Sequence, residues 1–206
     1  MKYTIVGKEI PAVEFQLNQG ETIFTQSGGM SWQTDGIEMT TNARGGVLKG
    51  LGRMFAGESM FMAHYRAHRD GASIAFAATV PGSVVPVDVE QSGGIIIQKG
   101  AFLCAEDTVE LETVFTKKLS AGFFGGEGFI LQRLEGRGKA FLEIDGDMVQ
   151  KDLKPGEVLK VDSGNVAAFS STVSYEVETV KGMGNILFGG EGLFLTRLVG
   201  PGRVIL

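Results

Sequence analysis

Three glutamates occupy the same place in a recurring Phe-x-Gly-Glu motif, and carboxylates repeated in this way are the first candidates for chemistry. They are Glu58, Glu127 and Glu191. Carboxylates can act as general acid and base or as ligands, but a single active site needs different roles at different positions. Three copies of one carboxylate therefore favour a structural part over a catalytic one, with ligand or acid–base chemistry as the alternative.

Arginines follow two of these glutamates at a fixed distance and indicate what the carboxylates do. Arg133 lies six residues after Glu127, and Arg197 lies six residues after Glu191. His64 takes the corresponding place in the first copy. Within one strand this spacing separates the two groups by about 20 Å, so they cannot pair there. We expect each glutamate to pair with an arginine of a neighbouring repeat or subunit, because bidentate Arg–carboxylate geometry fixes register.

A glycine-rich segment between residues 42 and 54 carries three basic side chains, Arg44, Lys49 and Arg53. Successive backbone N–H groups in glycine-rich turns can cradle a phosphate, which makes this segment a candidate anion- or ligand-binding site. It has neither the Gly-Lys-Ser/Thr ending of a P-loop nor a dinucleotide fingerprint. A solvated loop is the alternative. The apolar residues interspersed there add a weaker hypothesis, attachment to an anionic membrane surface.

The histidines and the cysteine do not form a recognisable catalytic or metal-binding set. His64 and His68 are the only two histidines, and Cys104 is the only cysteine. A zinc site needs three or four ligands, and cupin enzymes need a His-rich motif that this chain lacks. We therefore expect no catalytic residues, no metal and no cofactor, and we expect that the protein is not an enzyme.

Composition favours an all-β protein. The chain has 206 residues, of which 43% are hydrophobic and 31 are glycine. This glycine content is about twice the usual share. Glycines placed between short apolar runs indicate many tight turns, where positive φ angles are needed. Alternation of apolar and polar residues, as in residues 13–17, is typical of half-buried strands.

Charge and cysteine usage limit the partners and the location. The formal net charge is −5, so no global field favours nucleic acid or an anionic membrane. The sequence has no apolar run of the length that spans a bilayer, and residues 1–8 do not resemble a signal peptide. A lone cysteine suits a reducing compartment. We predict a cytoplasmic protein.

Internal repeats organise the whole chain. Residues 124–142 return without a gap as residues 188–206, and residues 55–62 match the start of this unit. Residues 17–30 align in the same way with residues 153–166. We predict one domain, residues 1–206, made of three pseudo-repeats at about 1–72, 73–144 and 145–206. Units of about 65 residues are marginal alone, so the three are expected to share one sheet system.

Several motifs together carry a resemblance to a known family. They are the segment 46–61, the Pro81-Gly82 turn, residues 100–105, the Gly125-Gly126-Glu127-Gly128 turn and the closing Gly200-Pro201-Gly202. In this order the chain resembles the uncharacterised family named for altered inheritance of mitochondria protein 24. The resemblance implies a fold like the tryptophan RNA-binding attenuation protein, with a β-sandwich or short double-stranded β-helix repeated three times. It also implies a homotrimer, and it implies no reaction.

The leading functional hypothesis is a non-enzymatic, oligomeric β scaffold or binding protein. Binding of RNA or tryptophan does not follow from the fold alone, and the acidic composition disfavours nucleic acid. A small-molecule or anion-binding protein that uses inter-repeat clefts or the Arg44–Arg53 loop is the second hypothesis. A peripheral membrane protein is the third.

Overall fold

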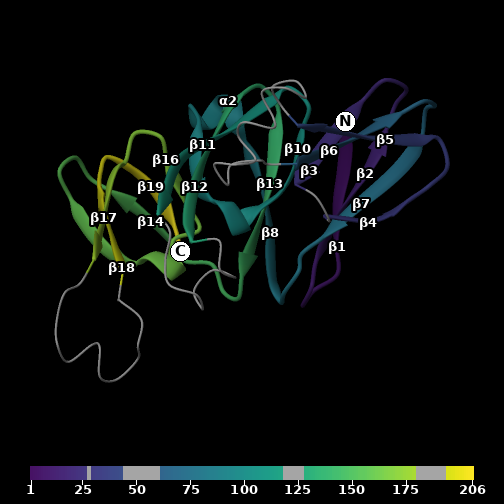
Figure 1. Cartoon of the computed structure of the whole chain (residues 1–206). Coiled ribbons are helices and arrows are strands. Elements are labelled where there is room, and N and C mark those ends of the chain that lie inside the picture. Colours follow the sequence, from purple (N-terminus) through teal and green to yellow (C-terminus); the bar gives the residue numbers. More distant parts are fainter. Residues whose placement is uncertain (27–28, 44–60, 118–127, 180–193) are drawn as a thin grey trace. The chain divides into compact units, whose positions relative to one another are not determined.

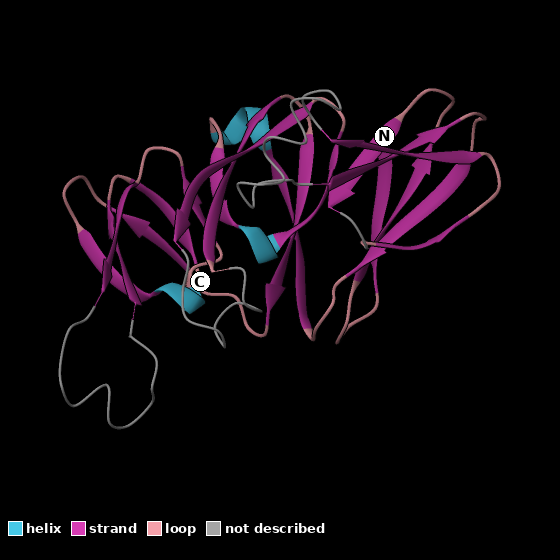
Figure 2. Ribbon diagram, in the orientation of Figure 1, coloured by secondary structure: helices cyan, strands magenta, loops and turns pink. Residues whose placement is uncertain are grey.

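The computed structural model describes residues 1–26, 29–43, 61–117, 128–179 and 194–206. Most of these residues lie in strands, and the helical segments are single short turns (Figures 1 and 2). The prediction of an all-β chain is therefore confirmed. The segments predicted as half-buried strands show the expected alternation: Glu14 and Gln16 of one strand are more exposed than Val13, Phe15 and Leu17.

The chain divides into two compact units. Unit 1 comprises Met1–Asp88, Phe102–Val109 and Arg137–Asp147, and unit 2 comprises Val89–Ala101, Glu110–Gly136 and Met148–Leu206. These limits do not follow the repeat boundaries expected near residues 72 and 144. The division of the chain into three repeats stays a prediction.

Unit 1 contains two sheets. Sheet A has the strand order β1-β2-β7-β4, and sheet B has the order β5-β6-β3-β10-β13-β8. Neighbouring strands in both sheets run antiparallel. The strands are β1 (Lys2–Val6), β2 (Ala12–Leu17), β3 (Thr22–Gln26), β4 (Met30–Gln33), β5 (Ile37–Ala43), β6 (Phe61–Ala67), β7 (Ala72–Ala77), β8 (Gly82–Asp88), β10 (Phe102–Glu106) and β13 (Lys139–Asp145).

Unit 2 also contains two sheets. Sheet C has the strand order β11-β12-β9-β16-β19-β14, and sheet D has the order β15-β18-β17. Its helical turns are α2 (Val89–Ser92) and the 3₁₀ turns η1 (Lys99–Ala101) and η3 (Ser163–Asn165). The strands are β9 (Ile95–Gln98), β11 (Val109–Lys117), β12 (Phe129–Gly136), β14 (Gln150–Leu153), β15 (Val158–Asp162), β16 (Ala168–Ser170), β17 (Ser174–Thr179), β18 (Phe194–Val199) and β19 (Gly202–Ile205).

Each unit has an apolar core built around phenylalanines. In unit 1, the rings of Phe15 and Phe141 meet edge to face with centroids 5.0 Å apart, and the ring of Tyr3 lies 4.9 Å from that of Phe141. In unit 2, the ring of Phe169 lies 5.4 Å from that of Tyr175. Both Phe141 and Phe169 are fully buried. Buried aromatic side chains of this size dominate core energetics, so these clusters hold the sheets of each unit together.

The two six-stranded sheets have the same internal order. Sheet B has the order β5-β6-β3-β10-β13-β8. When six is added to each of these strand numbers, the result is β11-β12-β9-β16-β19-β14, which is the order of sheet C. The three strands of sheet D relate in the same way to β9, β12 and β11 of sheet C, and β2, β7 and β4 of sheet A relate to β8, β13 and β10 of sheet B. Sheets A and D therefore match one half each of the larger sheets.

Candidate functional site

Most of the residues singled out by the sequence lie outside the described part of the chain. This applies to Arg44, Lys49 and Arg53 of the candidate anion site, and to the three repeated glutamates, Glu58, Glu127 and Glu191. The expected pairing of these glutamates with Arg133 and Arg197 therefore stays a prediction.

The structure places the three matched basic residues at equivalent sheet positions. His64 lies on β6 opposite Phe24 of β3, Arg133 lies on β12 opposite Ile96 of β9, and Arg197 lies on β18. Arg197 is opposite Lys160 of β15. Each of the three sits on the middle strand of a corresponding three-stranded group, β5-β6-β3, β11-β12-β9 or β17-β18-β15.

The surroundings of these three residues differ. The Nδ1 atom of His64 lies 2.9 Å from Oδ1 of Asp107, and its ring stacks on Phe24 with centroids 5.6 Å apart. Arg133 Nε lies 3.7 Å from Glu135 Oε1. Burial raises the pKa of the Tyr175 phenol, and the positive charge of Arg133 opposes this shift. His64 and Arg133, at equivalent sheet positions, thus have different local contacts.

The other histidine is also engaged. His68 Nε2 lies 2.8 Å from Glu38 Oε2 at an exposed position on unit 1. Within the ranges that the structure describes, no group of three or more His, Cys, Asp or Glu side chains could hold a metal ion. Cys104 is fully buried, and burial raises the pKa of its thiol well above the ordinary value.

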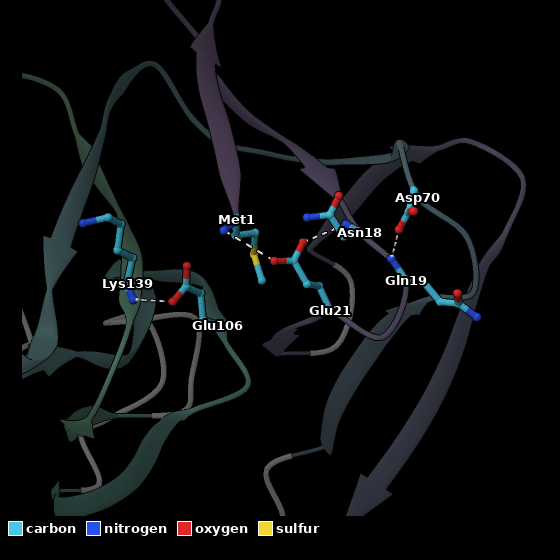
Figure 3. A network of polar contacts seen from close by, with 7 residues as sticks. All are labelled: Met1, Asn18, Gln19, Glu21, Asp70, Glu106 and Lys139. Carbon is cyan, nitrogen blue, oxygen red and sulfur yellow. Dashed lines mark hydrogen bonds and ion pairs between the residues drawn. The ribbon is translucent and has the colours of Figure 1, made fainter.

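Two carboxylates hold the backbone of one turn of unit 1, at Asn18 and Gln19 (Figure 3). Glu21 Oε2 accepts a hydrogen bond of 2.7 Å from the backbone N–H of Asn18, and Asp70 Oδ1 accepts one of 2.8 Å from the N–H of Gln19. Unit 2 repeats the first bond, because Glu157 Oε2 accepts from the N–H of Lys154 at 2.9 Å. The sequence match between residues 17–30 and 153–166 therefore corresponds to one turn structure found twice.

A second backbone contact occurs three times with three different acceptors. Thr34 Oγ1 accepts from the N–H of Ser73 at 2.9 Å. Glu106 Oε2 accepts from the N–H of Lys139 at 3.1 Å, a contact drawn in Figure 3. Ser170 Oγ accepts from the N–H of Arg203 at 3.0 Å. In each case the acceptor closes the end of one strand against its neighbour in the sheet.

Among the edge strands of the four sheets, β4 and β15 differ from their counterparts in strand order, and we call their outer sides the open edges. Within the described ranges, β4 pairs only with β7, and β15 pairs only with β18. Their counterparts in strand order are paired on both sides: β10 and β16 lie between two strands, as do β3 and β9. Trp32 of β4 is 45% exposed and Val158 of β15 is 44% exposed. Unpaired N–H and C=O groups at an edge are a template for another strand, so these edges are the candidate functional surface.

Comparison with known proteins gives the family. A protein-family model described as "Mitochondrial biogenesis AIM24" matches residues 3–206. The chain belongs to the AIM24 family. The family resemblance inferred from the sequence motifs is thereby confirmed.

Two relatives of this AIM24-family chain come from Streptococcus pyogenes. An uncharacterised protein of the serotype M6 strain is 27% identical over 205 residues, which is 95% of this chain and 81% of that protein. An X-ray crystal structure of a S. pyogenes protein matches with a TM-score of 0.79 and 26% identity, covering 99% of this chain and 91% of that chain. Neither description names a ligand or a reaction, so AIM24 membership leaves the function open.

Sequence reasoning on this AIM24 chain missed the open edges. Residues 30–33 are expected as a strand, but an isolated run of four residues does not reveal how many partners it has. One signal was present: Trp32, the only tryptophan, stands where a core aromatic is the expectation, and the structure leaves it half-exposed at an edge.

No helix in the described ranges is long and apolar enough to span a membrane.

Glu143 on β13 supplies a pH-dependent prediction. Burial raises the pKa of its carboxyl, hydrogen bonds from the N–H and hydroxyl of Thr79 oppose this, and the charge of Asp145 adds to it. The folded state thus holds the proton more tightly than the unfolded chain, and this contribution to stability is lost as pH rises from the ordinary value through the raised pKa. We expect Glu143→Gln, which keeps an acceptor for Thr79, to raise the Tm at pH 7.

The control for this prediction is Glu143→Ala, which removes the acceptor for Thr79 and should lower the Tm at pH 7 and at about pH 4. At about pH 4, where the carboxyl is mostly protonated in both states, the gain from Glu143→Gln should be much smaller than at pH 7. Thermal melts of the three proteins followed by circular dichroism test this. An equal gain at pH 4 and pH 7 would show that the carboxylate charge is not the cause.

Proposed function

We propose that this AIM24-family protein is a non-enzymatic, homo-oligomeric β scaffold built from three tandem repeats. The observation that carries the proposal is the constant offset of six between strand numbers at matching sheet positions. In this assignment, β2–β7, β8–β13 and β14–β19 are the three repeats. The first boundary then falls between β7 and β8, a few residues after the position near 72 that sequence matching suggests.

Local details support the same assignment. The register of β4 against β7 shifts between Met30 and Trp32, and that of β10 against β13 shifts between Phe102 and Cys104 at the matching place. The side-chain acceptors Thr34, Glu106 and Ser170 close the same strand end in each proposed repeat. Irregularities of this kind are retained features of a β fold, which is why their recurrence favours a common origin of the repeats.

Each proposed repeat contributes one three-stranded group to each of two sheets. Sheet B joins β5-β6-β3 of the first repeat to β10-β13-β8 of the second, and sheet C joins the second to the third in the same way. A fold in which sheets B and C are each shared between successive repeats suits the likeness to the tryptophan RNA-binding attenuation protein. It is also suited to continue from chain to chain, so we propose a homotrimer. We propose that it acts in the cytoplasm.

We propose that the scaffold is not an enzyme. His64, Arg133 and Arg197 occupy equivalent places in the sheets, but the contacts of His64 and Arg133 differ, which does not suggest one shared reaction. Binding of a small molecule is the second candidate. A hollow of about 370 Å³ in unit 1, lined by Met1–Thr4, Glu14 and Gln16, is one place where a retained molecule would be sought. The anion and membrane alternatives at Arg44–Arg53 lie outside the described residues and stay predictions.

Native mass spectrometry of the protein as purified tests the proposal. We expect a species of three times the 22.0 kDa chain mass. A trimer without an adduct supports the scaffold, whereas a stoichiometric small-molecule adduct would favour the binding role. A monomer at micromolar concentration contradicts the oligomeric proposal.

A further inference from the structure

The two open edges occupy places that are joined inside the chain. β3 pairs with β10, and β9 pairs with β16, each time linking one proposed repeat to the next. The third member of this series would link β15 to β4, the counterpart of β10 and β16. We propose that β15 of one copy pairs antiparallel with β4 of a second copy of this chain. This inference rests on the proposed function, because it names the contact that would build the oligomer.

The backbone groups of β15 point the required way. Gly200 N–H donates to the carbonyl of Glu157 at 2.9 Å, which makes residues 157 and 200 a hydrogen-bonded pair between β15 and β18. Bonding direction alternates along an antiparallel strand. Leu159 therefore also bonds towards β18, and the N–H and C=O of Lys160 point to the open edge.

The backbone groups of β4 point outward in the matching way. Thr34 N–H donates to the carbonyl of Ser73 at 2.8 Å, which makes residues 34 and 73 a hydrogen-bonded pair. By the same alternation Trp32 bonds towards β7, while the N–H and C=O of Gln33 point to the open edge. Among the residues that the structure describes, both edges thus offer unpaired donors and acceptors with the spacing of an antiparallel ladder.

The pairings within the chain, β3 with β10 and β9 with β16, fix the register expected between β15 and β4 of the second copy. Ala105 pairs with Phe24 in the first join, and Phe169 pairs with Ile96 in the second. Gln33 is the counterpart of Ala105 by its place after the register shift, and Lys160 is the counterpart of Phe24 by the sequence match. The contact therefore places Gln33 opposite Lys160 of the second copy, with Thr34 opposite Leu159.

The ends of the internal joins agree with this register. Asp107 N–H donates to the carbonyl of Thr22 at 3.2 Å, and Ser171 N–H donates to that of Gly94 at 3.4 Å. Both bonds lie two residues beyond the paired Ala105 or Phe169. The corresponding bond between copies runs from Asp35 N–H to the carbonyl of Val158.

Burial at matched positions shows what the contact would cover. Cys104 of β10 and Ala168 of β16 are 0% exposed, whereas Trp32, their counterpart, is 45% exposed. On the other edge, Phe24 of β3 is buried and Lys160 of β15 is exposed. The β15 edge of one copy meets the β4 edge of the next, so the two contacting surfaces are different. Copies therefore associate head to tail and either close into a ring or extend as a filament.

Disulfide trapping between two single-cysteine proteins tests the contact. Gln33→Cys and Lys160→Cys are made separately, each with Cys104→Ala, mixed in equal amounts after dissociation and reassembly, and oxidised. Opposed Cα atoms about 5.5 Å apart suit a disulfide. We expect more covalent dimer in the mixture than in either protein alone, where such a product could only join like cysteines. The matched control mixes Gln33→Cys with Val158→Cys, which lies two residues out of register.

The outcomes separate this contact from the oligomer itself. If native mass spectrometry shows a trimer but the 33–160 mixture gives no more product than the control, the edge contact is wrong and the scaffold proposal stands. A wild-type monomer overturns both. Trp32 fluorescence provides a second measurement without mutation: the emission of the only tryptophan should shift to longer wavelength when the oligomer dissociates on dilution. Emission that is unchanged through dissociation overturns the contact.

Discussion

Replacing Phe141 with alanine is expected to lower the free energy of unfolding by about 3–5 kcal/mol. The ring is fully buried in unit 1 and meets Phe15 and Tyr3 edge to face with centroids about 5 Å away. Its removal leaves a cavity between side chains of sheets A and B that rigid strands cannot collapse to fill. Urea unfolding followed by circular dichroism measures the loss.

Phe169→Ala is the matched variant in unit 2, because this ring is also fully buried and lies 5.4 Å from Tyr175. We expect the same magnitude, and we expect both variants to shift one common transition. Each unit is made of three chain segments that alternate along the sequence, so unfolding one unit releases the ends of the segments that form the other. Two separate transitions, each moved by only one variant, would contradict the prediction of a single domain.

The all-β class was predictable because it depends on local features. Glycines with positive φ, such as Gly20 and Gly156 in the matched turns, separate short apolar runs and can be recognised in the sequence. The turn α2 was not predicted, since Val84–Val89 reads as a continuous strand. Residues 89–92 instead form one helical turn that ends at Gly93 and Gly94, both with positive φ.

The triple contact at the strand ends could not be found by matching letters. Thr34, Glu106 and Ser170 share an oxygen acceptor and a position, but not a residue type. A hydroxyl and a carboxylate can each accept one backbone hydrogen bond. Sequence identity therefore decays at this position while the contact is kept, and the match appears only when strand order is known.

The open edges were equally out of reach of the sequence. Whether β15 has one neighbour or two depends on pairing between strands far apart in the chain, and Val158–Asp162 looks like any other short strand. Two of the candidate residues that the sequence did supply, Arg133 and Arg197, were found because charged residues stand out within apolar repeats. Backbone groups at an edge carry no such signal, since every residue has them.

Lys160→Pro is expected to abolish or strongly weaken assembly while leaving the chain folded. Proline removes an N–H that points to the open edge and is tolerated on edge strands where no ladder bond is lost. The apparent dissociation constant of the oligomer should rise by at least about tenfold, equivalent to about 1.4 kcal/mol. Analytical ultracentrifugation over a concentration series gives this constant, and circular dichroism reports on the fold.

Two neighbouring substitutions decide whether the missing N–H is the cause. Lys160→Ala keeps the N–H but removes the exposed ion pair with Glu178, whose atoms lie 3.0 Å apart, and such pairs contribute little. It should assemble like the wild type. Leu159→Pro removes an N–H that faces β18, so it should lower the Tm of the chain itself. Assembly by Lys160→Pro at wild-type strength would show that the β15 edge is not the contact, because an antiparallel partner at this register requires that donor.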